Sequence, residues 1–209
     1  MTPPPGIAVR PPLDWGVSGH AMPGEQVSGD LHIVSFFENG VLIGVVDGLG
    51  HGPEAAAAAR MACSVLEAHA SEPIVALVKR CHEALRRTRG VVISVASIDT
   101  VERVMRWIAV GNVEGILFRS DRAARPSRES VLARSGVVGY QLPQLGSKEH
   151  PIAAGDTLVF ATDGIKDGFA NAVPLHLNPQ EAASEILSRF AKDSDDALVL
   201  VARWLGDPS

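Results

Sequence analysis

Two β-rich segments separated by an Asn-Gly pair place the strongest constraint on the fold of this chain. Residues 31–37 and 41–46 each have the length of a strand, and Glu38-Asn39-Gly40 lies between them. An Asn-Gly pair between two such segments is a strong local signal for a β-hairpin. The first clearly predicted unit is therefore an antiparallel strand pair, rather than the strand–helix alternation that builds a parallel sheet.

The elements predicted after this hairpin favour an α+β fold. Pro53 suits the first position of a helix that runs to about residue 70, and a second helix runs from Pro73 to Gly90. The short junctions Asp99-Thr100 and Gly111-Asn112 predict that the strands on either side are antiparallel neighbours. The polar segment 119–130 is expected to be a loop. The remaining predicted elements are strands at 91–98, 103–110, 115–118, 131–134 and 156–161, a helix at 179–190 and a strand at 197–202.

The length of 209 residues corresponds to about one domain. Prolines crowd the beginning of the sequence, so residues 1–14 are expected to form an extended N-terminal extension. Residues 15–209 are expected to form a single domain.

Composition excludes several classes of function. The net charge of −5 argues against nucleic-acid binding, and an aromatic content of 5% leaves few side chains on which bases could stack. No apolar segment approaches the length that a bilayer needs, and no signal-peptide pattern appears, so a cytoplasmic protein with no membrane partner is expected. Cys63 and Cys81 lie in apolar, helix-like segments and are interpreted as buried free thiols.

Acidic residues recur at the ends of predicted strands. Asp30 opens a strand, Asp47 and Asp163 each end a strand before a glycine, and Asp195-Asp196 precedes the last strand. Carboxylates in such positions can converge on one edge of a sheet, and oxygen ligands without His or Cys suit Mg²⁺ or Mn²⁺. For any single position the alternative is an ordinary Asp-Gly turn.

The same segments resemble a known family. Four motifs carry the resemblance: Ser28-Gly29-Asp30, Val46-Asp47-Gly48-Leu49-Gly50-His51-Gly52, Ala161-Thr162-Asp163-Gly164-Ile165 and Asp195-Asp196-Ala197-Leu198-Val199-Leu200. They resemble, in order, those of the bacterial SpoIIE-type branch of the PP2C (PPM) serine/threonine phosphatases. Three further segments, Arg89-Gly90-Val91-Val92-Ile93-Ser94, Val110-Gly111-Asn112-Val113 and Gly136–Tyr140, resemble the small single-domain phosphatases of the stressosome within that branch. The resemblance spans residues 28–202. It implies an αββα sandwich of two mainly antiparallel sheets flanked by helices.

The resemblance also implies a site for two divalent cations, Mn²⁺ or Mg²⁺. Carried onto this sequence, Asp47 bridges both cations, while Asp30 and the carbonyl of Gly48 hold the second. Asp163 and Asp195 hold the first, and Asp196 is a further ligand or a supporting residue. The choice between Asp195 and Asp196 stays open at this point.

The activity implied by the resemblance is hydrolysis of phosphoserine or phosphothreonine in a protein, by attack of a metal-bridging hydroxide. Asp47 and Asp163 are then the central catalytic aspartates, acting as ligands and not as nucleophiles. The implied substrates are phosphorylated stressosome scaffold proteins with STAS domains, so that dephosphorylation resets a bacterial stress-signalling pathway. A monomer is expected.

Two other polar features, His51 and the basic face of the second predicted helix, each have two possible interpretations. His51 lies between two glycines and is either a general acid or a loop residue, whereas His20 and His32 are interpreted as structural. The second helix carries a basic face, which is interpreted as solvated or else as a contact for an acidic partner. That face consists of Lys79, Arg80, Arg86 and Arg87.

Two other functions compete with the phosphatase. Asp47-Gly48-Leu49-Gly50 also fits the Asp-x-Gly-x-Gly motif of GHKL-type ATP-binding anti-sigma kinases. Such a kinase needs an upstream helix with an Asn or Glu for Mg²⁺, whereas strands are predicted before Asp47. The other alternative is a catalytically degenerate phosphatase fold that only binds partners.

Overall fold

The predicted hairpin is present in the computed structural model, which describes residues 12–121 and 123–206. Strands β2 (Asp30–Phe37) and β3 (Gly40–Gly48) pair antiparallel across the turn at Asn39. The hairpin forms one side of a five-stranded sheet, sheet I, whose order is β2-β3-β4-β5-β8. The other strands of sheet I are β4 (Val91–Asp99), β5 (Val104–Val110) and β8 (Lys148–Pro151).

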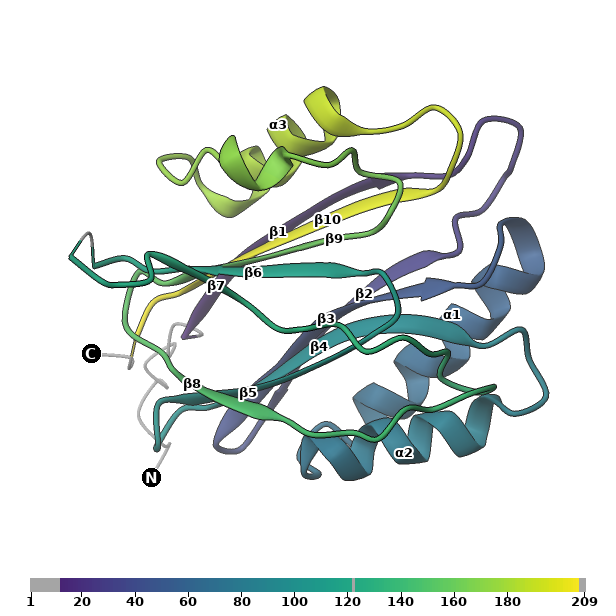
Figure 1. Ribbon diagram of the computed structural model, residues 1–209, viewed down its shortest axis with the longest axis horizontal. Coiled ribbons are helices and arrows are strands. Elements are labelled where there is room, and N and C mark those ends of the chain that lie inside the picture. The colour runs from purple at the N-terminus through teal and green to yellow at the C-terminus, as the bar shows by residue number, and fades with distance from the viewer. Residues whose placement is uncertain (1–11, 122, 207–209) are drawn as a thin grey trace, which may run out of the picture.

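A second five-stranded sheet, sheet II, packs against sheet I (Figure 1). Its order is β1-β10-β9-β6-β7, and its paired strands are all antiparallel. Its members are β1 (Leu13–His20), β6 (Glu114–Phe118), β7 (Arg128–Ser130), β9 (Thr157–Ala161) and β10 (Ala197–Trp204). Large buried side chains such as Trp107 and Phe160 fill the space between the two sheets.

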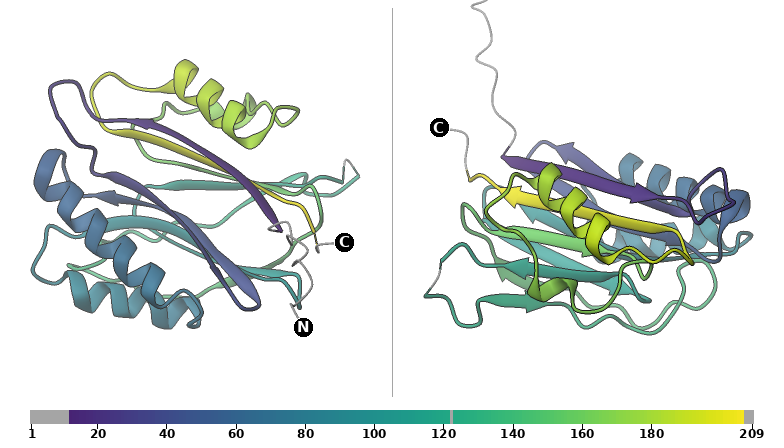
Figure 2. Two further views of the ribbon diagram at one scale, coloured as in Figure 1. Left: turned by 180° about the vertical axis from the view of Figure 1, so that it is seen from behind. Right: turned by 90° about the horizontal axis from the view of Figure 1, so that it is seen from above.

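Helices cover both outer faces, as the two views of Figure 2 show. Helices α1 (Gly52–Ala68) and α2 (Ile74–Leu85) cover sheet I, and α3 (Pro179–Phe190) covers sheet II after a short 3₁₀ turn, η1 (Phe169–Asn171). Each helical layer has its own apolar core against its sheet. The predicted α+β class and the αββα sandwich are therefore confirmed.

Strands β1 and β8 were missed by the sequence prediction. Gly16 and Gly19 lower the strand signal of β1, yet a Cβ at Gly16 would lie 2.3 Å from the backbone of Gln180 in α3. Close packing of α3 therefore requires a glycine inside this strand. Leu13 and Asp14, which the predicted extension includes, pair with Trp204 and Arg203 of β10. Residues 1–11 of that extension lie outside the described residues.

Three further local predictions were wrong. The strand predicted at 131–134 is reduced to an isolated bridge between Arg134 and Val110, and β7 lies instead in the segment predicted to be a loop. Strands β5 and β6 are not neighbours, because residues 111–113 cross from sheet I to sheet II. Three extended residues span roughly 10 Å, the usual separation of packed sheets, so a short junction fits this crossing as well as a hairpin.

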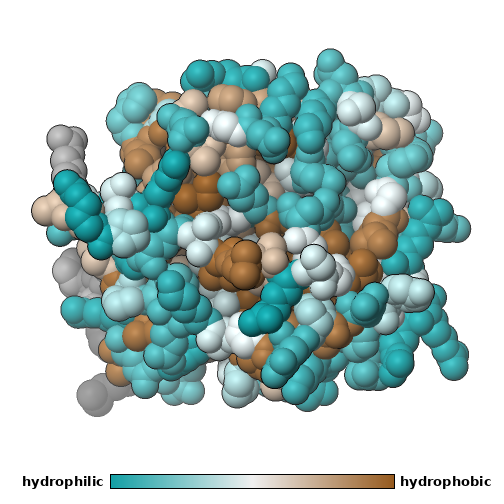
Figure 3. All heavy atoms as spheres, in the orientation of Figure 1, coloured by the Kyte–Doolittle hydropathy of each residue, from teal (hydrophilic) through white to brown (hydrophobic). Residues whose placement is uncertain are grey.

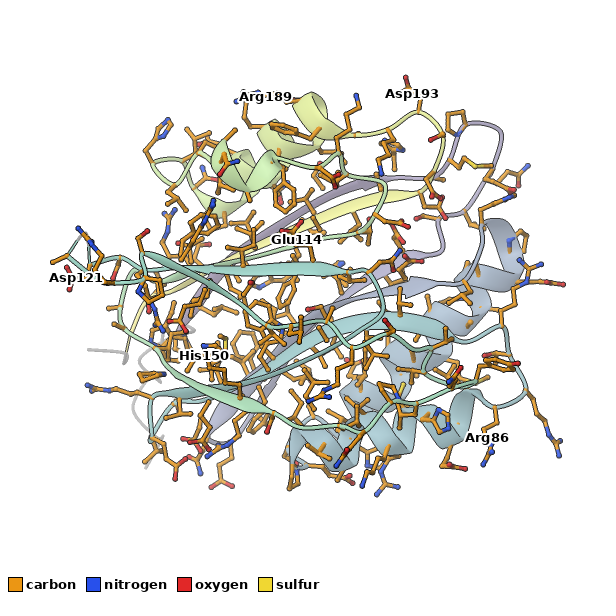
Figure 4. The ribbon with its side chains drawn as sticks, viewed as in Figure 1. Arg86, Glu114, Asp121, His150, Arg189 and Asp193 are labelled. Atoms are coloured by element: carbon orange, nitrogen blue, oxygen red, sulfur yellow. The ribbon has the colours of Figure 1, made fainter. Side chains whose placement is uncertain are left out.

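A partly buried ionic cluster joins the two sheets at the end of the sandwich where Figure 4 shows His150. Arg119 forms ion pairs with Glu129 of β7 and with Asp156, whose Oδ2 lies 2.9 Å from Nη1. Glu129 Oε2 also lies 2.9 Å from Nδ1 of the fully buried His150 on β8. Because β7 belongs to sheet II and β8 to sheet I, the cluster fixes the two sheets to each other.

The surface and the helices add two observations. On the face of Figure 1, hydrophobic surface occurs in separate patches among hydrophilic side chains (Figure 3). Within residues 12–121 and 123–206, no helix is long and apolar enough to span a membrane.

Candidate active site

Four strand ends meet at one end of the sandwich. In the register of β2 and β3, Asp30 is the direct partner of Asp47. On sheet II, Asp163 lies just beyond β9 and Asp195 just before β10, and β9 and β10 are neighbours. These ends lie on the right in Figure 1, where the loop before β10 runs beside the loop between β1 and β2. The topology therefore brings together aspartates that are up to 165 residues apart in sequence.

A cavity of about 680 Å³ opens at this point. Asp47, Asp163 and Asp195 are among its lining residues, and Asp30 is buried beside them with 4% of its surface exposed. The other walls come from the segment 49–51 and from the crossing at Gly111 and Asn112. No Lys or Arg lines the cavity among the described residues, so its charge is strongly negative.

Asp30 is held by a buried hydroxyl. Thr162 Oγ1 donates to Oδ2 of Asp30 at 2.8 Å and accepts from the backbone N–H of Leu198 at 2.9 Å. Burial raises the pKa of Asp30 to about 7, although the bond from Thr162 lowers it, and the negative charge of Asp196 raises it further. The hydroxyl of Thr162 thus fixes the orientation of an aspartate on the opposite sheet.

Asp47 is the most strongly perturbed group in the cavity. Burial and then the neighbouring charges of Asp30, Asp163 and Asp195 raise its pKa to about 9. Each of these causes disfavours a carboxylate in the absence of a positive charge. The position of Asp47 is therefore one at which a bound cation would be strongly stabilised.

Asp163 has two partners that sequence reasoning missed. Asn112 Nδ2 donates to Oδ2 of Asp163 at 2.6 Å, and Lys192 Nζ donates to the backbone carbonyl of Asp163. Burial and then the charge of Asp195 raise the pKa of Asp163, whereas Lys192 and Asn112 lower it. The sequence signals for Asn112 are its position in a Gly-Asn junction and the resemblance of Val110-Gly111-Asn112-Val113 to a segment of the stressosome phosphatases.

The adjacent aspartates Asp195 and Asp196 differ in their environment. Both carboxylate oxygens of Asp196 accept backbone N–H groups at 2.7 Å, Oδ1 from Met22 and Oδ2 from Gly29. Asp196 is buried and connects the loop before β2 to the start of β10. Asp195 lines the cavity, and its Oδ1 accepts the N–H of Asp196 at 2.9 Å.

Both Asp-Gly steps have a steric explanation. A Cβ at Gly48 would lie 2.2 Å from the carbonyl oxygen of Ala55 in α1, and a Cβ at Gly164 would lie 1.9 Å from that of Asp196. A glycine at each step lets a second segment approach the backbone beside the aspartate. The glycines therefore set the close packing of the site and do more than form turns.

The predicted histidines occupy different positions. His51 lines the cavity at the start of α1, and its Nδ1 lies 2.6 Å from Oε1 of Glu25 in the loop before β2. His32 stacks at a tilt against Trp15, and burial lowers the pKa of His32. His20 Nδ1 contacts the neighbouring carbonyl of Ala21. His51 is thus the only one of these three histidines that lines the cavity.

The chemistry of these donors fits hard divalent cations. The available ligands are carboxylate and carbonyl oxygens, which Mg²⁺ and Mn²⁺ prefer. Among the described residues, no three His, Cys, Asp or Glu side chains are placed to enclose an ion by themselves.

The sandwich and its acidic end define the class of the protein. The αββα fold matches solved PP2C domains, and it carries the carboxylate cluster at one edge of its paired sheets. A family model described as Stage II sporulation protein E (SpoIIE) matches residues 38–205. The chain therefore belongs to the SpoIIE family and is a PP2C-type phosphatase.

Individual relatives agree with this assignment. The chain is 26% identical over 165 residues to the phosphoserine phosphatase RsbX of Bacillus subtilis (strain 168), covering 78% of each protein. It is 31% identical to a chain in the solved structure described as "The bacterial stressosome: a modular system that has been adapted to control secondary messenger signaling". The TM-score is 0.83, and the match covers 91% of this chain and 99% of that one. It also matches the fold of RsbX in complex with magnesium, at 21% identity, a TM-score of 0.80 and coverage of 91% and 94%.

The kinase alternative is not favoured by the fold. In residues 12–47 the structure contains strands and loops, without the upstream helix that a GHKL-type ATP site needs. Asp47 instead lies within the electrostatic influence of four further aspartates, which are Asp30, Asp163, Asp195 and Asp196.

Proposed function

We propose that this chain hydrolyses phosphoserine or phosphothreonine in a protein, with two divalent cations, Mg²⁺ or Mn²⁺, bound at the acidic end of the sandwich. The single observation that carries this proposal is the convergence of Asp30, Asp47, Asp163 and Asp195 beside one open cavity, where burial and then the neighbouring negative charges raise the pKa of Asp30, Asp47 and Asp163. The membership in a phosphatase family supplies the reaction type.

In this proposal the ligands divide between two cations. Asp47 would hold both, Asp30 and the carbonyl of Gly48 would hold one, and Asp163 and Asp195 would hold the other. Asp195 is preferred to Asp196 because both oxygens of Asp196 already accept backbone N–H groups. Asp196 then positions the loop before β2 instead of binding a cation directly.

The residues of the chain hold this arrangement before any substrate arrives. Thr162 orients Asp30, and Asn112 orients Asp163. When bound, divalent cations supply the positive charge that stabilises the phosphoryl oxygens and lowers the pKa of water. Asp47 and Asp163 keep their catalytic assignment because they line the cavity, and they act as ligands rather than as nucleophiles.

The cysteines do not compete for the nucleophilic role. Burial raises the pKa of both Cys63 and Cys81 to about 12, and neither lines the acidic cavity. The reactive form of a cysteine is the thiolate, which is scarce at such a pKa. Both are free thiols, which supports a reducing, cytoplasmic location as part of the proposal.

The substrate part of the proposal follows the relatives. RsbX is a phosphoserine phosphatase, and a 31% identical chain comes from a stressosome structure. We therefore include phosphorylated stressosome proteins with STAS domains as substrates, so that their dephosphorylation resets a stress-signalling pathway. A monomer suffices, because every proposed ligand comes from one chain.

Hydrolysis of p-nitrophenyl phosphate tests the proposal. We expect release of p-nitrophenol with Mn²⁺ or Mg²⁺ and none with EDTA. No hydrolysis with either cation would favour the degenerate, partner-binding alternative. Calorimetry with ATP is the parallel test of the kinase alternative, for which we expect no binding.

A further inference from the structure

A second cavity lies beside the acidic one and has the opposite charge. It has a volume of about 460 Å³ and lies between the exposed side of α1 and the segment after α2. We define this arginine groove by Glu54, Ala57, Met61, Arg87, Thr88 and Arg89. None of these residues is used by the proposed catalytic site.

The arginine groove and the acidic cavity share a wall. Arg89 Nη1 lies 2.8 Å from the position that a Cβ would take on Gly50, and Gly50 lines the acidic cavity. The N–H of Leu49, another residue of that cavity, donates to the carbonyl of Gly90 at 3.1 Å. A peptide that leaves the acidic cavity across Gly50 therefore meets Arg89 first.

The groove retains an uncompensated positive charge. Arg89 pairs with Glu54, and Arg86 pairs with Glu83 at 3.2 Å. The exposed Arg87 makes no hydrogen bond or ion pair with any described residue. This excess contrasts with the net charge of −5 of the whole chain and with the negative cavity alongside.

The groove also offers an apolar contact. Met61 is 43% exposed, and Ala57 lies one turn before it on the exposed face of α1. A methionine side chain adapts to partners of different shape. A small apolar patch with an unpaired arginine at its edge suits an extended peptide that carries both apolar and acidic residues.

We propose that the arginine groove binds the segment of the phosphoprotein substrate that flanks the phosphorylated residue, and that it selects acidic residues there. The inference rests on the proposed phosphatase function. Its physical basis is charge: the acidic cavity repels an acidic substrate, whereas the adjacent groove attracts its flank and sets its direction of entry.

The test compares two phosphoserine peptides that differ only in their flanking residues, glutamates in one and lysines in the other. The wild-type protein with Mn²⁺ should hydrolyse the acidic peptide with the higher kcat/KM. Arg87→Glu should lower kcat/KM for the acidic peptide about 10-fold, as expected for reversal of one interfacial charge, and should leave p-nitrophenyl phosphate hydrolysis within about twofold.

Arg86→Glu is the matched control. Arg86 is exposed at the end of α2 (Figure 4) and has the same charge, but it does not line the groove and is already paired. We expect Arg86→Glu to retain the preference for the acidic peptide. Equal kcat/KM values for the two peptides in the wild type would overturn the proposal that the groove binds the flanking segment. Equal losses of kcat/KM in Arg86→Glu and Arg87→Glu would also overturn it.

A binding measurement separates the groove from the catalytic proposal. Fluorescence anisotropy of the labelled acidic peptide in EDTA reports the groove without turnover. Weaker peptide binding by Arg87→Glu than by Arg86→Glu supports the peptide-binding role of the groove. This holds even if the wild type hydrolyses nothing, in which case only the phosphatase proposal fails. Equal binding by both variants contradicts the groove, whatever the activity.

Discussion

Asp30 and Asp47 face each other directly across β2 and β3, so that one hairpin brings two carboxylates together at its end. Like charges directly opposite each other destabilise a strand pair. The cost is increased by burial, which raises the pKa of both groups. A protein keeps such a pair where it serves a function, and we propose that this pair serves to attract cations.

The first prediction concerns the stability of this pair. Asp30→Asn should raise the midpoint of thermal unfolding of the cation-free protein at pH 9, where Asp30 is ionised and Asp47 is about half ionised, because it removes one of the two repelling charges. It should also abolish most of the increase in that midpoint that Mn²⁺ gives the wild type. Differential scanning calorimetry in EDTA and in Mn²⁺ measures both effects. A lower midpoint in EDTA would show that repulsion between these two carboxylates does not limit the stability of the cation-free protein.

The second prediction concerns pH. Asp30 and Asp47 have pKa values of about 7 and about 9 in the folded protein, well above that of an unfolded aspartate. The folded state then binds more protons than the unfolded state between about pH 4 and pH 9, so the free energy of unfolding falls as the pH rises. Denaturant unfolding in EDTA at pH 6 and pH 8.5 should show this fall.

Added Mn²⁺ is the control for the pH dependence. The cation should stabilise the protein more at pH 8.5 than at pH 6, because protons compete with cations for the same carboxylates. Stability in EDTA that is constant or rises over this range would contradict the proposed repulsion.

The third prediction concerns Asn112. Asn112→Ala removes the amide that donates to Asp163, and Asn112 is exposed, so folding should be little affected. The apparent affinity for Mn²⁺ should fall about 10-fold or more, the range found when a supporting residue of a metal ligand is lost. Activity titrated against Mn²⁺ measures this, with the thermal midpoint in EDTA as the control. An unchanged Mn²⁺ dependence would remove Asn112 from the site.

The fourth prediction separates stability from activity. Arg119→Met leaves Asp156 without its cation and leaves Glu129 with only His150 and the more distant Lys148, at the end of the sandwich away from the acidic cavity. Breaking such an ion pair should cost about 3 kcal/mol of unfolding free energy. Urea unfolding measures this cost, and kcat on p-nitrophenyl phosphate below the transition should be retained. A loss of kcat in the folded variant would show that the cluster also acts on the catalytic site.

The sequence predicted most of the elements that position the site. The Asn39-Gly40 turn and the Pro53 helix start are local signals, so the hairpin and α1 follow directly from residue type. Strand β1 was not predicted because Gly16 exists to admit α3, a contact between segments distant in sequence. The crossing at Gly111-Asn112 was misread because a three-residue junction fits both a hairpin and a change of sheet.

In the candidate site, too, some residues could be predicted from local sequence signals, whereas others depend on contacts between distant segments. Asp30, Asp47, Asp163 and Asp195 could be proposed from their positions at strand ends and from the family resemblance. The different surroundings of Asp195 and Asp196 depend on the N–H groups of Met22 and Gly29, which only the folded chain brings close. Asn112 likewise depends on the crossing between the sheets.

The central claim is that the acidic end hydrolyses a phosphoprotein with the help of divalent cations, and phosphate release from a phosphoserine peptide tests it most directly. At saturating Mn²⁺ we predict phosphate release by the wild type, none in EDTA, and a rate at least about 100-fold lower for Asp47→Asn, the loss typical of removing a central electrostatic group. Phosphate release by Asp47→Asn within a few-fold of the wild-type rate would contradict the account.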